Sequence, residues 1–129
     1  MQFMKSSAVL KECIHKAYQK VGLHTEKFRH FSYLIQGNVI LSSGMNKQIN
    51  HTCIYPRQTY HAEFVAWMRG RKRTNIRKPW YMINVRIGKD MALRTSKPCH
   101  ICESLLYSAG CSKVIYTINK ETEGCLHLN

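Results

Sequence analysis

The chain has 129 residues, of which 44% are apolar, so it can build one hydrophobic core and is too hydrophobic for a disordered tail. Its 20 lysines and arginines against 7 acidic residues give a formal net charge of +13, which favours a phosphate-bearing partner over a neutral one. The apolar runs are too short for a membrane span or a secretory leader, so we expect a single domain over residues 1–129, no membrane partner and a cytoplasmic or otherwise intracellular location.

The first half of the chain predicts a helix followed by a hairpin. Apolar residues recur three and four positions apart over residues 6–23, which indicates a helix with one buried face and Gly22 as its end signal. The stretch FSYLIQGNVILSS, residues 31–43, then predicts two strands joined at Gly37 and Asn38.

The second half alternates between helices and strands. Residues 60–70 predict a short helix, residues 79–88 a strand, residues 98–110 a helix and residues 113–118 a last clear strand. A helical crossover between the last two strands implies that they pair in parallel. The order α-β-β-α-β-α-β therefore predicts an α/β fold, a three-layer α-β-α sandwich around a mixed sheet.

Cys99 and Cys102 lie three residues apart in the first turn of the helix predicted for residues 98–110, with Pro98 in the same turn. This spacing places both thiols on one face, where the positive end of the helix dipole should lower their pKa. Without an export signal, the six cysteines indicate reduced thiols or metal ligands rather than disulfides. The pair alone fits a redox site, a structural zinc site or a working metal site.

A further zinc ligand is available at the start of the other helix, where the sequence reads HAE from His61. Helix N-termini gather at the carboxyl ends of parallel strands, so His61, Cys99 and Cys102 should converge on one zinc ion with its fourth position open. An open position is typical of a catalytic zinc, whose bound water has a pKa of about 7. Glu63, two residues from His61, is placed to carry the protons of that water.

The two motifs, HAE at residues 61–63 and PCHIC at residues 98–102, resemble those of the cytidine deaminase superfamily, whose zinc enzymes carry H-x-E and P-C-x-x-C. The predicted order of helices and strands is also similar to that fold over about residues 5 to 118. The resemblance implies that Glu63 moves a proton from the water to the ring nitrogen and then to the departing amine of cytosine or adenine. It further implies that the Ala62 N–H binds the base carbonyl and that Asn46 contacts the sugar. Asn46 is equally an ordinary turn residue after a strand.

The substrate follows less directly from the resemblance. With histidine at position 61, the chain resembles the nucleotide, polynucleotide and pyrimidine-precursor deaminases more than the free cytidine enzymes, which usually have cysteine there. Lys97 stands where transfer-RNA adenosine deaminases often have glutamate, and residues 119–129 leave room for one short closing strand rather than a further helix. We therefore predict deamination of cytosine in a nucleotide or in single-stranded nucleic acid. A homo-oligomer is compatible with this prediction. A transfer-RNA adenosine deaminase is the alternative.

The basic run RGRKRTNIRK, residues 69–78, either binds phosphates or is a solvated loop. Three aromatic residues are available either for base stacking or for the core, namely Tyr60, Trp80 and Tyr116. A closed structural zinc that recruits His51 or Cys53 would instead make a basic nucleic-acid-binding module that is not an enzyme. A structural site has no use for Glu63, and a redox pair leaves the whole HAE motif unexplained.

Overall fold

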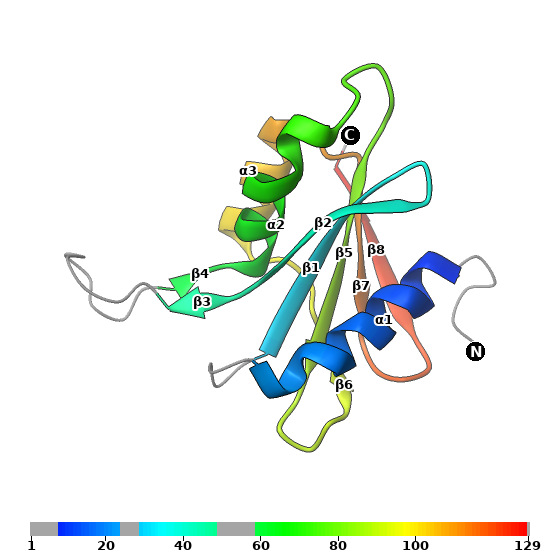
Figure 1. Cartoon of the computed structure of the whole chain (residues 1–129), viewed down its shortest axis with the longest axis vertical. Helices are drawn as coiled ribbons and strands as arrows, with labels where there is room; N and C mark the ends of the chain where they lie inside the picture. The colour runs from blue at the N-terminus through cyan, green and yellow to red at the C-terminus, as the bar shows by residue number, and fades with distance from the viewer. Residues whose placement is uncertain (1–7, 24–28, 49–58, 129) are drawn as a thin grey trace.

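The computed structural model describes residues 8–23, 29–48 and 59–128 of the chain. These residues form three layers, with helix α1 (Ala8–Lys20) on one face of a central sheet and helices α2 (Ala62–Gly70) and α3 (His100–Ala109) on the other (Figure 1). Short 3-10 turns, η1 (Val21–Leu23) and η2 (Arg71–Arg73), follow α1 and α2. The predicted three-layer α/β arrangement is confirmed. None of the described helices is long and apolar enough to cross a membrane.

The central sheet has the strand order β2-β1-β5-β7-β8, with β6 paired to β5. Its strands are β1 (Arg29–Gln36), β2 (Val39–Met45), β5 (Tyr81–Ile87), β6 (Leu93–Arg94), β7 (Lys113–Thr117) and β8 (Glu123–His127). A separate two-stranded sheet pairs β3 (Lys47–Gln48) with β4 (Thr59–Tyr60). Strands β5 and β7 are parallel and the other pairs are antiparallel, so the sheet is mixed as predicted.

Two local predictions about strands hold in the structure. Gly37 and Asn38 join β1 to β2 with φ values of 60° and 61°, the left-handed conformation that a two-residue type I′ hairpin turn requires. The end of the chain contributes β8, the single short strand expected after the last clear strand, and it pairs antiparallel with β7.

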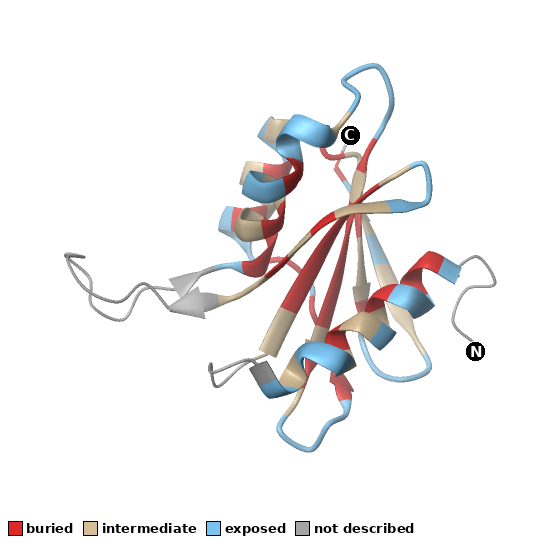
Figure 2. Cartoon of the chain, viewed as in Figure 1, coloured by how far each residue is buried: buried red, intermediate tan, exposed pale blue. Residues whose placement is uncertain are grey.

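The two faces of the sheet carry two separate hydrophobic clusters. Figure 2 shows the buried segments in red along the central strands and on the helices that cover them. Alternate residues of β1 face opposite layers, so Tyr33 packs in the cluster under α1 whereas Leu34 packs in the cluster under α2 and α3. Trp80 also belongs to the second cluster and is 6% exposed, which assigns it to the core rather than to base stacking. The ring of Tyr116 lies over Gly124, and the side chain of Tyr60 lies outside the described residues.

A glycine allows helix α2 to begin directly against strand β2. A Cβ atom at Gly44 would lie 2.5 Å from the backbone nitrogen of Ala66 and 2.7 Å from the carbonyl oxygen of Ala62. Any other side chain would push against the backbone of the first turn of α2, which cannot give way as a flexible side chain would. Gly44 thus fixes how closely the start of α2, which carries the HAE motif, approaches the sheet.

Candidate metal centre

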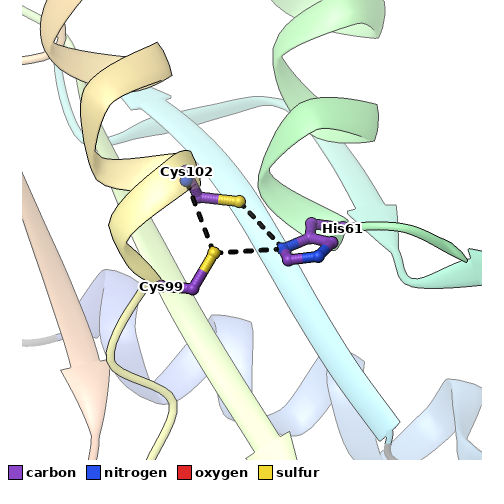
Figure 3. A group of neighbouring side chains, drawn as sticks. All are labelled: His61, Cys99 and Cys102. Atoms are coloured by element: carbon purple, nitrogen blue, oxygen red, sulfur yellow. Dashed lines mark hydrogen bonds between the residues drawn. The ribbon is translucent and has the colours of Figure 1, made fainter. Parts of the chain in front are cut away.

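Helices α2 and α3 begin next to each other, and each begins with a candidate zinc ligand (Figure 3). His61 is the N-cap of α2, and Cys99 is the N-cap of α3. Cys102 lies one turn further along α3, and its backbone N–H donates to the Cys99 sulfur at 3.5 Å. The three side chains point toward one another between the two helix ends (Figure 3).

The three ligand atoms fit a zinc ion. The Nδ1 atom of His61 lies 3.0 Å from the Cys102 sulfur and 3.5 Å from the Cys99 sulfur (Figure 3). A tetrahedral zinc with its usual bond lengths to nitrogen and sulfur needs roughly 3.5 Å between such atoms. All three ligand atoms lie within 4.8 Å of one another, which is close enough to bind one zinc ion. The predicted convergence of His61, Cys99 and Cys102 is therefore confirmed.

The start of α3 differs from the prediction in two respects. The helix begins at His100, so Pro98 precedes the N-cap instead of lying in the first turn. The pKa of the Cys102 thiol is raised rather than lowered, first because burial penalises the thiolate and then because of the negative charges of Glu63 and Cys99. Desolvation outweighs the helix dipole at this position. A zinc ion between the ligands would reverse the direction, since its charge favours the thiolate.

Glu63 lies in the first turn of α2, buried at 7% exposure, and lines the same cavity as His61 and Cys99. Its Oε2 atom accepts a hydrogen bond of 2.8 Å from the side-chain nitrogen of Asn84, on strand β5. Asn84 is not among the site residues predicted from the sequence. A signal was present, because Asn84 shares the core-facing side of its strand with Met82, and a polar residue at a buried apolar position needs a partner.

A cavity of about 210 Å³ opens beside the three ligands. Its lining comprises His30, Asn46, His61, Ala62, Glu63, Lys97 and Cys99. The structure therefore brings the predicted substrate contacts, Asn46 and Ala62, to the same cavity as Glu63. It adds His30 and Lys97, which sequence reasoning had not placed there.

Asn46 is held at the cavity by strand β1. Its Oδ1 atom accepts a hydrogen bond of 3.0 Å from the His30 backbone N–H, and its own backbone N–H donates to the His30 carbonyl at 3.2 Å. Both bonds continue the β1–β2 pairing by one residue beyond β2. This geometry gives Asn46 a structural task in addition to the predicted contact with the sugar. The candidate fourth ligands of a closed site, His51 and Cys53, lie outside the described residues.

Comparison with known proteins gives a consistent result. The model for the cytidine and deoxycytidylate deaminase zinc-binding region matches residues 4–118. A dCMP deaminase from the cyanophage S-TIM5, solved in apo form, has a TM-score of 0.63 at 19% identity, with 89% of this chain and 86% of that chain covered. A cytidine deaminase from Mycobacterium tuberculosis has a TM-score of 0.56 at 12% identity, with 86% and 88% covered. A search of curated proteins found no significant match.

Proposed function

We propose that this chain, which belongs to the cytidine and deoxycytidylate deaminase family, hydrolyses the exocyclic amino group of cytosine in a nucleotide of the deoxycytidylate type. The observation that carries this proposal is the convergence of His61, Cys99 and Cys102 at a cavity that His61 and Cys99 line together with the buried carboxylate of Glu63. A structural zinc site has no use for such a carboxylate, whereas hydrolysis of an amine needs a group that moves protons.

The proposed chemistry divides between the metal and the protein. A zinc ion held by the three ligands would act as a Lewis acid and lower the pKa of a bound water to about 7. Glu63 takes one proton of the attacking water and passes it to the ring nitrogen of cytosine. It then takes the remaining proton of the added hydroxyl and passes it to the amine, so that ammonia leaves and the ring carbon becomes a carbonyl. Glu63 is buried and lines the cavity, so little bulk water competes for these protons.

Ala62 and Asn46 would orient the nucleoside. Ala62 is the first residue of α2, where backbone N–H groups have no acceptor within the helix, so its N–H suits the base carbonyl. Asn46 lines the same cavity and directly follows β2, so its amide suits a sugar bound in that cavity.

An Asn46→Ala protein tests the sugar contact. We expect kcat/KM to fall about tenfold or more with zinc content unchanged, because one hydrogen bond to the substrate contributes roughly 0.5 to 1.5 kcal/mol and stranding a buried partner adds to this. The His30 N–H also loses its acceptor, so a modest fall in melting temperature should accompany the change. A fall in melting temperature with kcat/KM intact would leave Asn46 with the structural task alone.

The position of the basic residues supports a nucleotide as the carrier of the base. Lys97 is the single lysine or arginine among the described residues that line the cavity, and its side chain is exposed, so it can meet a substrate phosphate. The basic run of residues 69–78 begins at the opposite end of α2, a helix that rises about 12 Å from Ala62 to Gly70. In one solved structure, the dCMP deaminase of cyanophage S-TIM5 is in complex with dCMP and dUMP.

Several arginines of the basic run have partners within the protein. Arg73 donates to the Leu41 carbonyl at 2.7 Å and Arg69 to the Ser43 carbonyl at 3.2 Å, so both cover outward-facing carbonyls of the edge strand β2. The Arg71 guanidinium lies 5.3 Å from the centre of the Trp67 ring. These contacts account for part of the positive charge as structure. The remaining charge favours single-stranded nucleic acid as the second candidate carrier.

Two charge-reversal proteins separate the carriers. If the substrate is a nucleotide, Lys97→Glu should raise KM for deoxycytidylate about tenfold or more through loss of a charge-assisted hydrogen bond, and should leave cytidine turnover unchanged. Reversal of three exposed residues of the basic run should then change neither activity, the residues being Lys72, Arg77 and Lys78. Ammonia release is measured with deoxycytidylate, cytidine, cytosine-containing single strands and adenosine-containing transfer RNA.

The other outcomes of this panel are equally specific. Turnover of single strands, with affinity that falls with salt at a log-log slope of about −0.7 per phosphate contact and is lost on triple reversal, would favour the polynucleotide. Turnover of adenosine alone would overturn the choice of cytosine. A zinc-loaded protein that turns over none of the substrates would support the non-enzymatic module.

A further inference from the structure

We propose that Asn84 is a positioning residue for the reaction, which holds the Glu63 carboxylate in the orientation that proton transfer requires. This inference rests on the proposed function of the site. Asn84 is 4% exposed and lies behind Glu63 on β5, so it supports the carboxylate from the side of the sheet. It is not among the residues that line the cavity, so it would act through Glu63.

The hydrogen bonds define which way the Asn84 amide points. One side of the amide meets the Glu63 Oε2 atom at 2.8 Å and the Ser96 carbonyl at 3.1 Å, and the other meets the Ser32 hydroxyl at 2.8 Å. A carboxylate and a carbonyl only accept hydrogen bonds, so the NH2 group must face them. The Ser32 hydroxyl then donates to the amide oxygen. Both amide hydrogens are thereby used, and the amide has a single satisfied orientation.

The partners of Asn84 are themselves immobilised. Ser32 lies directly opposite Asn84 in the β1–β5 pairing. The Ser96 hydroxyl donates to the Asn84 carbonyl at 2.8 Å and accepts a hydrogen bond of 2.9 Å from the backbone N–H of Thr117 on β7. Ser32, Ser96 and Thr117 are each at most 1% exposed. The network therefore ties Glu63 to three neighbouring strands and to the segment that leads into Cys99.

Burying this polar network stabilises the fold less than apolar side chains at the same positions would. Asn84 and Ser32 occupy core-facing positions that continue the rows of Met82 and Leu34, where apolar side chains would pack without the need for partners. A flexible buried carboxylate would sample several orientations, whereas a carboxylate held by a fixed donor is preorganised toward the cavity. The polar residues of the sheet lie next to Glu63. This is the position expected of residues that orient the Glu63 carboxylate.

The test compares zinc-loaded Asn84→Ala with a matched control, Ser42→Ala. Ser42 is also buried, and its hydroxyl donates to the Ala66 carbonyl at 2.7 Å, so its loss removes another hydrogen bond between the sheet and α2. We expect Asn84→Ala to lower kcat about 10- to 100-fold, with KM within about twofold and one zinc per chain retained. Ser42→Ala should lower the melting temperature by a similar amount and keep the wild-type kcat.

Further measurements make each outcome decisive. Crystal structures of the wild type and of Asn84→Ala should show the Glu63 carboxylate displaced in the variant, a readout that does not depend on activity. If the wild type deaminates nothing, the proposed function fails and these structures still test Asn84. Should Asn84→Ala fail to fold, Ser32→Ala replaces it, because the amide then loses the hydroxyl that fixes its orientation; a lower kcat at constant KM supports the proposal. An unmoved Glu63, or a kcat equal to that of the control, would overturn it.

Discussion

A Glu63→Gln protein should bind zinc as the wild type does, and its deaminase activity should fall about 10²- to 10⁴-fold, the range typical of general acid–base catalysis. Glutamine has nearly the same shape and still offers an oxygen to the Asn84 amide, so the buried hydrogen bond survives the change. It cannot accept the proton of the attacking water. Zinc content by metal analysis, melting temperature and ammonia release measure the three quantities separately.

A matched control is available on α3. Glu103→Gln makes the same chemical change one residue after Cys102, in a side chain that is not among those lining the substrate cavity. It should leave activity within about twofold, in the range of substitutions away from buried or functional features. If Glu63→Gln loses zinc together with activity, Glu63 acts on the metal itself, and if it stays active another group moves the protons.

The residues that could be predicted from the sequence are those whose position depends on local structure. His61 and Cys99 precede helices that periodicity and end signals predict, and the spacing of Cys99 and Cys102 needs only one helical turn. Their convergence follows from one topological rule, since the parallel β5–β7 pair brings two helix N-termini to one edge of the sheet. For this reason the sequence alone predicts that His61 lies beside the distant pair Cys99 and Cys102.

The residues that could not be predicted depend on tertiary contacts. Asn84 turns its NH2 group toward Glu63 because the β1–β5 register places the Ser32 hydroxyl beside its amide oxygen, and register is not readable from one strand. His30 reaches the cavity through its pairing with Asn46 beyond the end of β2. The pKa of Cys102 was predicted in the wrong direction because the helix dipole is a local property, whereas burial depends on the whole fold.

Replacement of the cysteine ligands should have the other large effect, the loss of both zinc and activity. We expect about one zinc per chain in the wild type and none in the double Cys99→Ala, Cys102→Ala protein, with complete loss of deamination. Two other cysteines serve as matched controls, since Cys125 is exposed as Cys99 is, and Cys111 is buried as Cys102 is. Each control variant should retain its zinc. Melting temperature should fall in the double variant and in chelator-treated wild type, because binding energy of a metal contributes to folding.

The pH dependence of zinc binding tests the same site through Cys102. Its pKa is raised in the folded chain, so the thiol is protonated at neutral pH and must release that proton to bind zinc. Cys99 also binds zinc as the thiolate, so rising pH favours binding through both cysteines, and each released proton corresponds to an affinity gain of about tenfold per pH unit. Chelator competition between about pH 6 and 8 measures this slope. Cys102→Ala removes the proton that this thiol releases, so its residual zinc affinity should rise less steeply with pH, whereas the exposed control Cys125→Ala should keep the wild-type slope. If the double Cys99→Ala, Cys102→Ala protein of the metal analysis still holds one zinc per chain, the metal lies elsewhere, and the proposed mechanism loses its Lewis acid.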